Sequence, residues 1–276
     1  MIDVNATETK AILNAAVAST QFVYDHDGIP YVVIPDGYRL QDIEHLMETP
    51  QRKRGNVIVH TAGGIIEYVN KHKIDGATII YASVDLDAAK CQLVAVLNDH
   101  HSAGPLWRDH RCTFAPKPSV EWKRWIQKNK AQFTQAEFAS FLEDNLADIA
   151  PADGMPSGSD ILQMCLAFEA TADKRLRSKI NMQSGGVQFE YVDDEDKDTR
   201  TRMQVFRSFM VGIPVFEGAT SGYKMEARLK YRERDGKLTF WYELIREDRV
   251  FRAAVNDMLA VIVNGTGVPI IYGTPE

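Results

Sequence analysis

Possible metal ligands and proton-transfer groups crowd into residues 98–112. The segment holds three of the seven histidines, two aspartates and one of the three cysteines, in the order Asn98-Asp99-His100-His101 and then Trp107-Arg108-Asp109-His110-Arg111-Cys112. Imidazole and thiolate groups are ligands that zinc and other transition metals take. Gly104-Pro105 allows a turn that would bring His110 near His100. The candidate metal ligands are therefore His100, His110 and Cys112.

Other features of the same segment favour a structural role. The spacing matches no zinc motif, and the adjacent His100 and His101 would point to opposite faces of an extended strand. Cys112 and His110 could act as nucleophile and base only if a further group oriented the base. A loop in which His and Arg side chains bind carbonyls and carboxylates explains the same residues. A metal-dependent enzyme stays as one alternative.

Motifs of well-known enzyme classes are missing from the chain. It contains neither GxSxG nor HExxH, and neither GxGxxG nor GxxxxGK[ST]. Gly63-Gly64 follows an apolar strand, as phosphate-binding loops do, but a helix turn accounts for these glycines as well. We therefore predict no catalytic residue and no cofactor, which favours a non-enzymatic role.

A basic segment with aromatic residues occupies the hairpin expected from Tyr223 to Ile245, with its turn at Asp235-Gly236. Residues 223–231 alternate, so Lys224, Glu226, Arg228 and Lys230 are expected on one face of the first strand. Single-stranded nucleic acids bind to basic side chains that contact phosphates beside aromatic rings that stack on bases. Glu226, Glu233, Asp235 and Glu243 dilute the charge, so a solvated sheet face protected by Lys and Arg is the competing interpretation. The candidate nucleic-acid-binding residues are Lys224, Arg228, Lys230, Arg232 and Trp241.

Composition places further bounds on function. Cys91, Cys112 and Cys165 are too scattered for a disulfide framework, so a reducing cytoplasm fits best. No apolar run is long enough to cross a membrane, and the N-terminus lacks the pattern of a signal peptide. The net charge of −6 argues against nucleic-acid binding by the whole surface. Residues 107–130 are mostly basic and 134–173 are acidic, and such blocks can pair within a fold or between copies.

The pattern of apolar and turn residues predicts an α+β fold. We expect an N-terminal α/β portion (1–115), a helical segment (116–182) and an antiparallel sheet with a packed helix (183–276), with one composite domain as the alternative arrangement. The expected helices include 6–18, a short one from Arg39 to Met47, one from Thr61 to Lys71, one opened by a capping box at Thr134, and one that starts at Ser159. A hairpin with its turn at Asp27-Gly28 is expected after the first helix. The last helix is expected to run from an N-cap at Asp248 to Asn264-Gly265.

Four stretches carry a family resemblance. They are Leu97-Asn98-Asp99-His100, Pro105 to Arg111, Ser119 to Trp125 and Phe138 to Asn145, with support from Phe206 to Leu244. Together they resemble the YfdQ-like family of phage and prophage proteins. The resemblance implies a phage-derived protein, often encoded near recombination and replication genes, and it supplies no catalytic residue.

The leading expectation is a phage accessory protein in the cytoplasm of a bacterial host that acts as a homo-oligomer. The first alternative is a factor that binds single-stranded DNA and works with phage recombination proteins. The second is the metal-dependent enzyme based on His100, His110 and Cys112. We expect no membrane partner for any of these.

Overall fold

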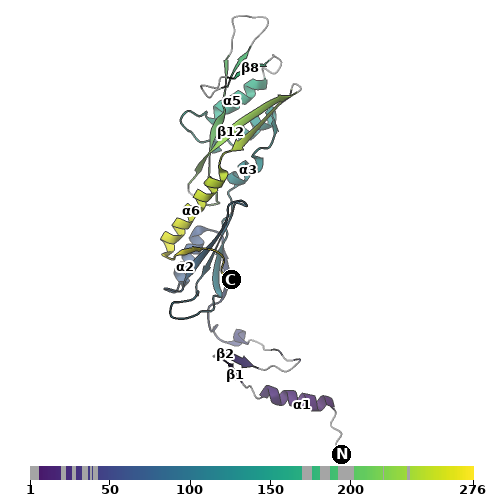
Figure 1. Ribbon diagram of the computed structural model, residues 1–276, viewed down its shortest axis with the longest axis vertical. Helices are drawn as coiled ribbons and strands as arrows, with labels where there is room; N and C mark the ends of the chain where they lie inside the picture. Colours follow the sequence, from purple (N-terminus) through teal and green to yellow (C-terminus); the bar gives the residue numbers. More distant parts are fainter. Residues whose placement is uncertain are drawn as a thin grey trace, which may run out of the picture. The chain divides into compact units, whose positions relative to one another are not determined.

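The computed structural model describes residues 6–19, 23–26, 29–32, 37, 39, 43–169, 176–180, 187–191, 202–219, 221–234 and 237–276. Contacts divide the chain into two units, Met1–Lys53 and Arg54–Glu276. Helices and mainly antiparallel sheets follow one another along the chain, which confirms the predicted α+β class (Figure 1). In the described residues, no helix has both the length and the apolar character needed to span a membrane.

The first unit contains helix α1 (Ala6–Ser19) and the antiparallel pair β1 (Val23–His26) and β2 (Ile29–Val32). Both the helix and the hairpin agree with the sequence prediction, whereas the predicted Asp27-Gly28 turn lies outside the described residues. The helix expected near Arg39–Met47 is described only as one 3-10 turn, η1 (Glu44–Leu46), whose first residue has no side-chain cap.

A five-stranded mixed sheet forms one part of the second unit, with strand order β14-β4-β5-β6-β3. Its strands are β3 (Gly55–Val59), β4 (Ile79–Asp85), β5 (Lys90–Val96), β6 (His110–Phe114) and β14 (Ile270–Tyr272). The two outer pairs, β3–β6 and β14–β4, are parallel, and the inner pairs are antiparallel. Because β14 comes from the end of the chain, this sheet joins residues that the sequence prediction assigned to different parts.

Helices α2 (Ala62–His72) and α6 (Glu247–Thr266) pack against each other beside this sheet (Figure 1). The Thr61 hydroxyl caps α2 by accepting from the Gly64 amide, at 3.0 Å, as predicted. Alternate residues of β5, Cys91, Leu93 and Ala95, are buried in the core together with Ile65 and Val69 of α2. The side chains on one face of the strand therefore share a core with the apolar side chains on one side of the helix.

The other large sheet of the second unit is antiparallel, with strand order β11-β12-β13-β7. Its strands are β7 (Phe133–Thr134), β11 (Ser208–Ile213), β12 (Tyr223–Arg234) and β13 (Lys237–Leu244). The Asp235-Gly236 turn predicted between β12 and β13 lies outside the described residues. Helices α3 (Val120–Lys128), α4 (Gln135–Asp144) and α5 (Gly158–Glu169) and the 3-10 turn η2 (Leu146–Asp148) come from the middle of the chain.

Aromatic side chains pack helices α3 and α4 against one face of the antiparallel sheet. Phe138 of α4 stacks on Phe240 of β13 with ring centroids 5.4 Å apart. Trp125 of α3 lies 5.1 Å from Tyr242, whose hydroxyl donates to the Trp125 carbonyl oxygen. These aromatic rings bury a large apolar area on one face of the sheet. The opposite face is then the one that can carry polar side chains, as is common in antiparallel sheets. A further sheet, β10-β9-β8, consists of β8 (Leu176–Ile180), β9 (Val187–Tyr191) and β10 (Arg202–Val205).

The helix ends confirm some sequence predictions and correct others. The capping box of Thr134 and Glu137 is present as predicted. Helix α5 begins at Gly158, one residue before the predicted start at Ser159, and Ser157 caps it through reciprocal hydrogen bonds with Asp160. Asp248 is not the cap of α6 but lies in its first turn, where a carboxylate stabilises the helix dipole. Helix α6 also continues past the predicted Asn264-Gly265 end to Thr266, and Gly267, with φ +68°, is its C-cap.

Candidate functional site

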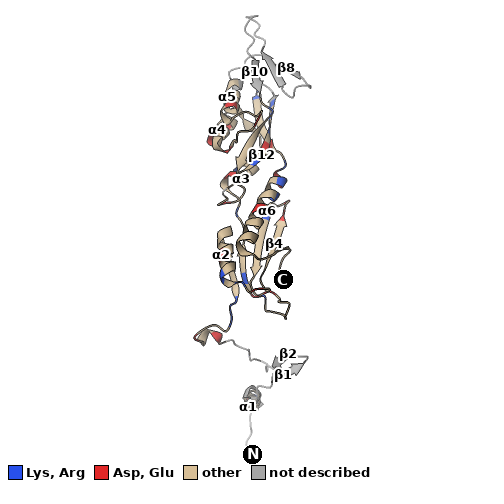
Figure 2. Cartoon of the chain, turned by 90° about the vertical axis from the view of Figure 1, so that its left-hand side faces the viewer, with Lys and Arg blue, Asp and Glu red and all other residues tan. Residues whose placement is uncertain are grey.

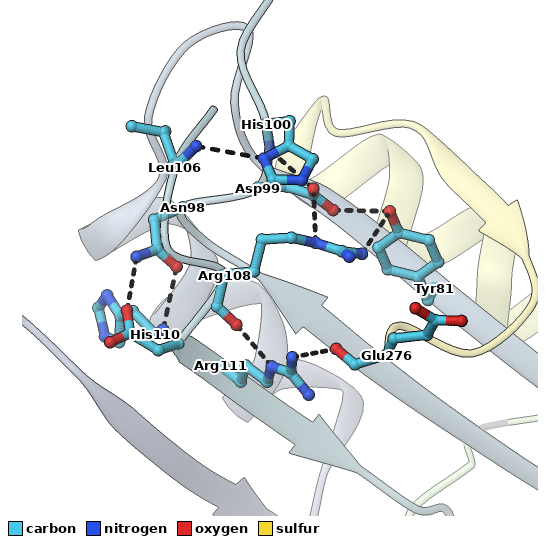
Figure 3. Close-up of polar contacts among 10 residues, drawn as sticks. Tyr81, Asn98, Asp99, His100, Leu106, Arg108, His110, Arg111 and Glu276 are labelled. Carbon is cyan, nitrogen blue, oxygen red and sulfur yellow. Dashed lines mark hydrogen bonds and ion pairs between the residues drawn. The ribbon is translucent and has the colours of Figure 1, made fainter. Parts of the chain in front are cut away.

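Asn98 ties together the two ends of the loop between β5 and β6. Its amide Nδ2 donates to Asp109 Oδ1 at 2.9 Å, and its Oδ1 accepts from the His110 amide at 3.0 Å. Its backbone carbonyl oxygen accepts from the Arg108 amide at 3.1 Å. One side chain and one carbonyl thus fix where β6 begins (Figure 3).

Asp99 is the buried centre of this loop and is 3% exposed. Its carboxylate accepts from the Tyr81 hydroxyl at 2.6 Å and from the His100 amide at 2.7 Å (Figure 3). Arg108 Nε lies 3.0 Å from Oδ1 but forms no hydrogen bond with it, so this contact is an ion pair. Burial alone would raise the pKa of Asp99, but the two hydrogen bonds and the Arg108 charge hold that pKa below its usual range.

Two arginines connect the loop with the end of the chain. Arg108 has a left-handed backbone, with φ +56°, and its Nη2 donates to the Tyr81 hydroxyl at 3.4 Å. Arg111 donates from Nε to the Arg108 carbonyl oxygen at 2.7 Å and from Nη2 to the Glu276 carbonyl oxygen (Figure 3). A non-glycine residue in this backbone region carries strain, which the surrounding bonds offset. These contacts connect the loop between β5 and β6 with Tyr81 of β4 and with Glu276, which indicates a structural role for the loop.

The three predicted metal ligands are held by separate contacts. His100 Nδ1 accepts from the Leu106 amide at 3.2 Å inside the loop. His110 Nε2 lies 3.0 Å from the hydroxyl of Tyr68 on α2, and its ring packs edge-on against His72. Cys112 is fully buried in the core, and burial raises the pKa of its thiol to about 11.

Within the part of the chain that the structure describes, no three His, Cys, Asp or Glu side chains group closely enough to hold a metal ion. The structure therefore does not bring His100, His110 and Cys112 together as a ligand set. The high pKa of the Cys112 thiol also disfavours the thiolate that a metal ligand or nucleophile needs.

The predicted nucleic-acid-binding residues, by contrast, share one sheet face. Residues 225, 227 and 229 of β12 are buried, so the intervening side chains lie on the opposite, outer face. The outer face of β12 carries Lys224, Arg228, Lys230 and Arg232, all exposed, and the half-buried Glu226. Trp241 of β13 pairs with Lys230 in register and therefore lies on the same face. We call these residues the basic face; Figure 2 colours the charges along β12.

Two contacts set the surroundings of Trp241. The Arg232 guanidinium carbon lies 5.6 Å from its ring centroid, which is within range of a cation–π interaction. The indole Nε1 donates to Glu243 Oε1 at 3.4 Å. The ring is thus oriented by a cation and a carboxylate on the exposed face of the sheet.

Lys224 differs from the other basic residues of this face. Its ammonium donates to the Pro151 carbonyl oxygen at 3.0 Å, across the paired Gly212 of β11. A side chain at Gly212 would come within 2.6 Å of Ala150, so glycine is required where residues 149–151 run antiparallel beside β11. The basic face is therefore anchored at Lys224 and presents Arg228, Lys230 and Arg232 to solvent.

Sequence reasoning missed a cleft of about 350 Å³ that opens beside the end of β6 and the first turn of α2. On its wall the Tyr223 hydroxyl donates to Asp257 Oδ2 at 2.7 Å. Burial, and then this carboxylate, raise the pKa of Tyr223 to about 12. Residues 223 and 257 belong to a strand and a helix that are far apart in the chain, so no local sequence motif could predict the pair. The hydrogen bond between the half-buried Tyr81 and the buried Asp99 was missed because it too joins residues of different elements.

Comparison with known proteins places the chain in a family. Residues 3–275 match the family model described as "Uncharacterized conserved protein (DUF2303)", so the chain is a member of that family. No curated protein matches the chain. No solved structure matches it either.

Proposed function

We propose that this member of the DUF2303 family is a phage- or prophage-derived accessory protein that binds single-stranded nucleic acid through the basic face. The likeness of Asn98-Asp99-His100 and Trp107 to Arg111 to YfdQ-like proteins supports the phage origin. A role beside phage recombination proteins in the cytoplasm of a bacterial host follows from that origin and belongs to the proposal.

One observation supports this function above all. Arg228, Lys230 and Arg232 occupy alternate positions on the exposed face of β12, and Trp241 lies beside them. Alternate residues of a strand are roughly 7 Å apart, so the three cations form a regular row that can follow a phosphate backbone. An aromatic ring beside such a row gives a base a surface on which to stack.

The same geometry favours single strands over duplexes. A base can reach a side chain that lies flat on an open sheet only when it is not paired within a helix. Glu226 and Glu243 lie on the same face and reduce its positive charge. We therefore expect moderate affinity, strong dependence on salt and little preference for sequence.

The test is binding of a fluorescent oligothymidine of about 16 nucleotides, a length at the upper end of single-strand site sizes. Binding by the wild-type protein is expected at low salt. Reversal of two charges in Arg228→Glu/Lys230→Glu is expected to weaken it at least about tenfold. The matched control, Lys90→Glu/Arg252→Glu, changes the net charge equally at exposed positions away from the basic face and is expected to bind like the wild type. Equal loss in both variants, or no wild-type binding, would contradict the proposal.

Self-assembly into a homo-oligomer, the other expected property, stays a separate prediction.

A further inference from the structure

The cleft beside the end of β6 lies at the carboxyl ends of two neighbouring parallel strands. Strand β3 ends at Val59 and β6 ends at Phe114, the two strands pair in parallel, and residues 60–63 and 114–117 line the cleft. In α/β sheets, small ligands bind in the crevice outside the carboxyl ends of the strands. The volume of about 350 Å³ lies near the lower end of the roughly 300–1,000 Å³ that is typical of small-molecule sites.

Backbone hydrogen bonds fix two segments that line the cleft. The Glu217 amide donates to the Lys117 carbonyl oxygen at 2.8 Å and so ties the two segments together. The Ala219 amide donates to the Phe216 carbonyl oxygen at 3.2 Å, in a turn whose Gly218 has φ +75° and therefore favours glycine. The lining is thus held by the fold itself, so little conformational entropy is lost when a ligand enters.

One group of lining residues suits an anion. The amides of Ala62 and Gly63 begin α2 and have no acceptor within the helix, whereas the Gly64 amide donates to the Thr61 hydroxyl. Lys117 also lines the cleft, is exposed, and has no carboxylate partner in the part of the chain that the structure describes. An ammonium and free backbone amides that line the same cleft are groups that bind phosphate.

A second group of lining residues suits hydroxyl groups. The Tyr223 hydroxyl donates to Asp257 Oδ2, and its raised pKa keeps it protonated at neutral pH. Asp257 Oδ1 makes no hydrogen bond with the described residues, so it stays available as an acceptor. Acidic side chains accept hydrogen bonds from sugar hydroxyls in nucleotide sites. The other acid of the lining, Glu217, lies 3.7 Å from Lys123 Nζ, which offsets its charge.

Apolar side chains form most of the remaining lining. Met258 and Val261 of α6 line the cleft together with Pro116, Phe114 and Phe216. Val261 is 55% exposed although it is apolar. A flat ring that displaces water from such a surface gains free energy through the hydrophobic effect.

We propose that this cleft binds a nucleoside monophosphate, with its phosphate at the start of α2 and at Lys117, its sugar hydroxyls at Asp257 and its base against Met258 and Val261. One molecule of this class carries all three kinds of group that the lining suits. Lys224 follows Tyr223 directly and lies on the opposite face of β12, so the cleft is separate from the basic face. Nucleotide binding in the cleft therefore goes beyond the proposed function.

The experiment is isothermal titration calorimetry of the full chain with adenosine monophosphate (AMP). The wild type is expected to bind AMP at least about tenfold more tightly than adenosine or inorganic phosphate, because each of these lacks one part of the ligand. Lys117→Ala is expected to weaken AMP binding at least about tenfold, whereas Lys90→Ala, which removes an exposed lysine of β5, leaves it unchanged. Val261→Trp fills the cleft and is expected to abolish binding. Val263→Trp, at a 36% exposed position of α6 outside the lining, is its matched control.

Several results would overturn the proposal. They are a wild type that gives no response to millimolar AMP, equal affinity for AMP and for adenosine or phosphate, and AMP binding that Lys117→Ala and Val261→Trp leave unchanged. If Val261→Trp fails to fold by circular dichroism, Ala219→Trp, at an exposed lining position, takes its place. Arg228→Glu/Lys230→Glu is expected to bind AMP like the wild type. Loss of AMP binding in that variant would place the nucleotide on the basic face and contradict a separate site.

Discussion

Replacement of Asp99 by alanine tests the structural role of the loop between β5 and β6. The substitution removes the acceptor for Tyr81 and for the His100 amide and leaves Arg108 without its carboxylate. Removing one partner of a buried ion pair costs about 3–5 kcal/mol. The Arg108 side chain is 24% exposed and so keeps some access to water. We therefore expect Asp99→Ala to lower the free energy of unfolding by about 3 kcal/mol, at the lower end of that range.

The assay is urea unfolding at pH 7, followed by far-ultraviolet circular dichroism. Asp75→Ala removes an exposed carboxylate instead and is expected to change the free energy of unfolding by less than about 0.5 kcal/mol. The double variant Asp99→Ala/Arg108→Ala is expected to lose less than the sum of the two single variants, because neither charge is then left unpaired. A loss below about 1 kcal/mol for Asp99→Ala would refute this account, since a typical surface substitution costs as little.

The pH dependence gives an independent check with a definite sign. The folded pKa of Asp99 lies below its unfolded value of about 3.9. The stabilisation is therefore fully present above that unfolded value and is lost as the pH falls through the folded pKa. The difference in the free energy of unfolding between the wild type and Asp99→Ala should be constant near neutral pH and should shrink below about pH 4. A difference in the free energy of unfolding that grows on acidification would contradict the conclusion that the ionised Asp99 stabilises the fold.

Three further predictions concern the basic face and the buried thiol. Trp241→Ala is expected to weaken oligothymidine binding by about 1–3 kcal/mol, measured by fluorescence anisotropy, whereas Trp241→Phe keeps most of the stacking. Glu243→Gln is expected to strengthen binding in the same assay, because it removes a negative charge from that face. Cys112 is expected to resist iodoacetamide at pH 8 in the folded protein and to react in urea, because burial raises its pKa to about 11; rapid labelling of the native chain, detected by mass spectrometry, would contradict its buried position.

Local chemistry made several elements predictable from the sequence. The hydroxyl of Thr134 and the carboxylate of Glu137 are three residues apart, and their capping box needs no information from the rest of the fold. The alternation of residues 223–231 likewise predicted that Lys224, Arg228 and Lys230 share one face before any partner strand was known. The register with β13 then adds Trp241 to that face.

Features that depend on distant residues were not predictable. Strand β14 joins β4 across nearly two hundred residues, and nothing within Ile270–Tyr272 specifies that partner. The histidines of residues 98–112 suggested a metal site because their types suit one. Asn98 and Asp99 instead organise the segment through Tyr81 and Arg108, and the Tyr81 contact comes from another strand. Ligand chemistry is visible in a sequence, whereas the direction in which each side chain points is set by the fold.

Photo-crosslinking tests the central claim most directly. The wild-type protein would be irradiated with an oligothymidine that carries a photoreactive halogenated base, and the linked peptides would be mapped by mass spectrometry. The proposed function predicts crosslinks within Lys237–Leu244, at or beside Trp241, that disappear as salt is raised. Crosslinks confined to other parts of the chain, or none at low salt, would contradict single-strand binding by the basic face.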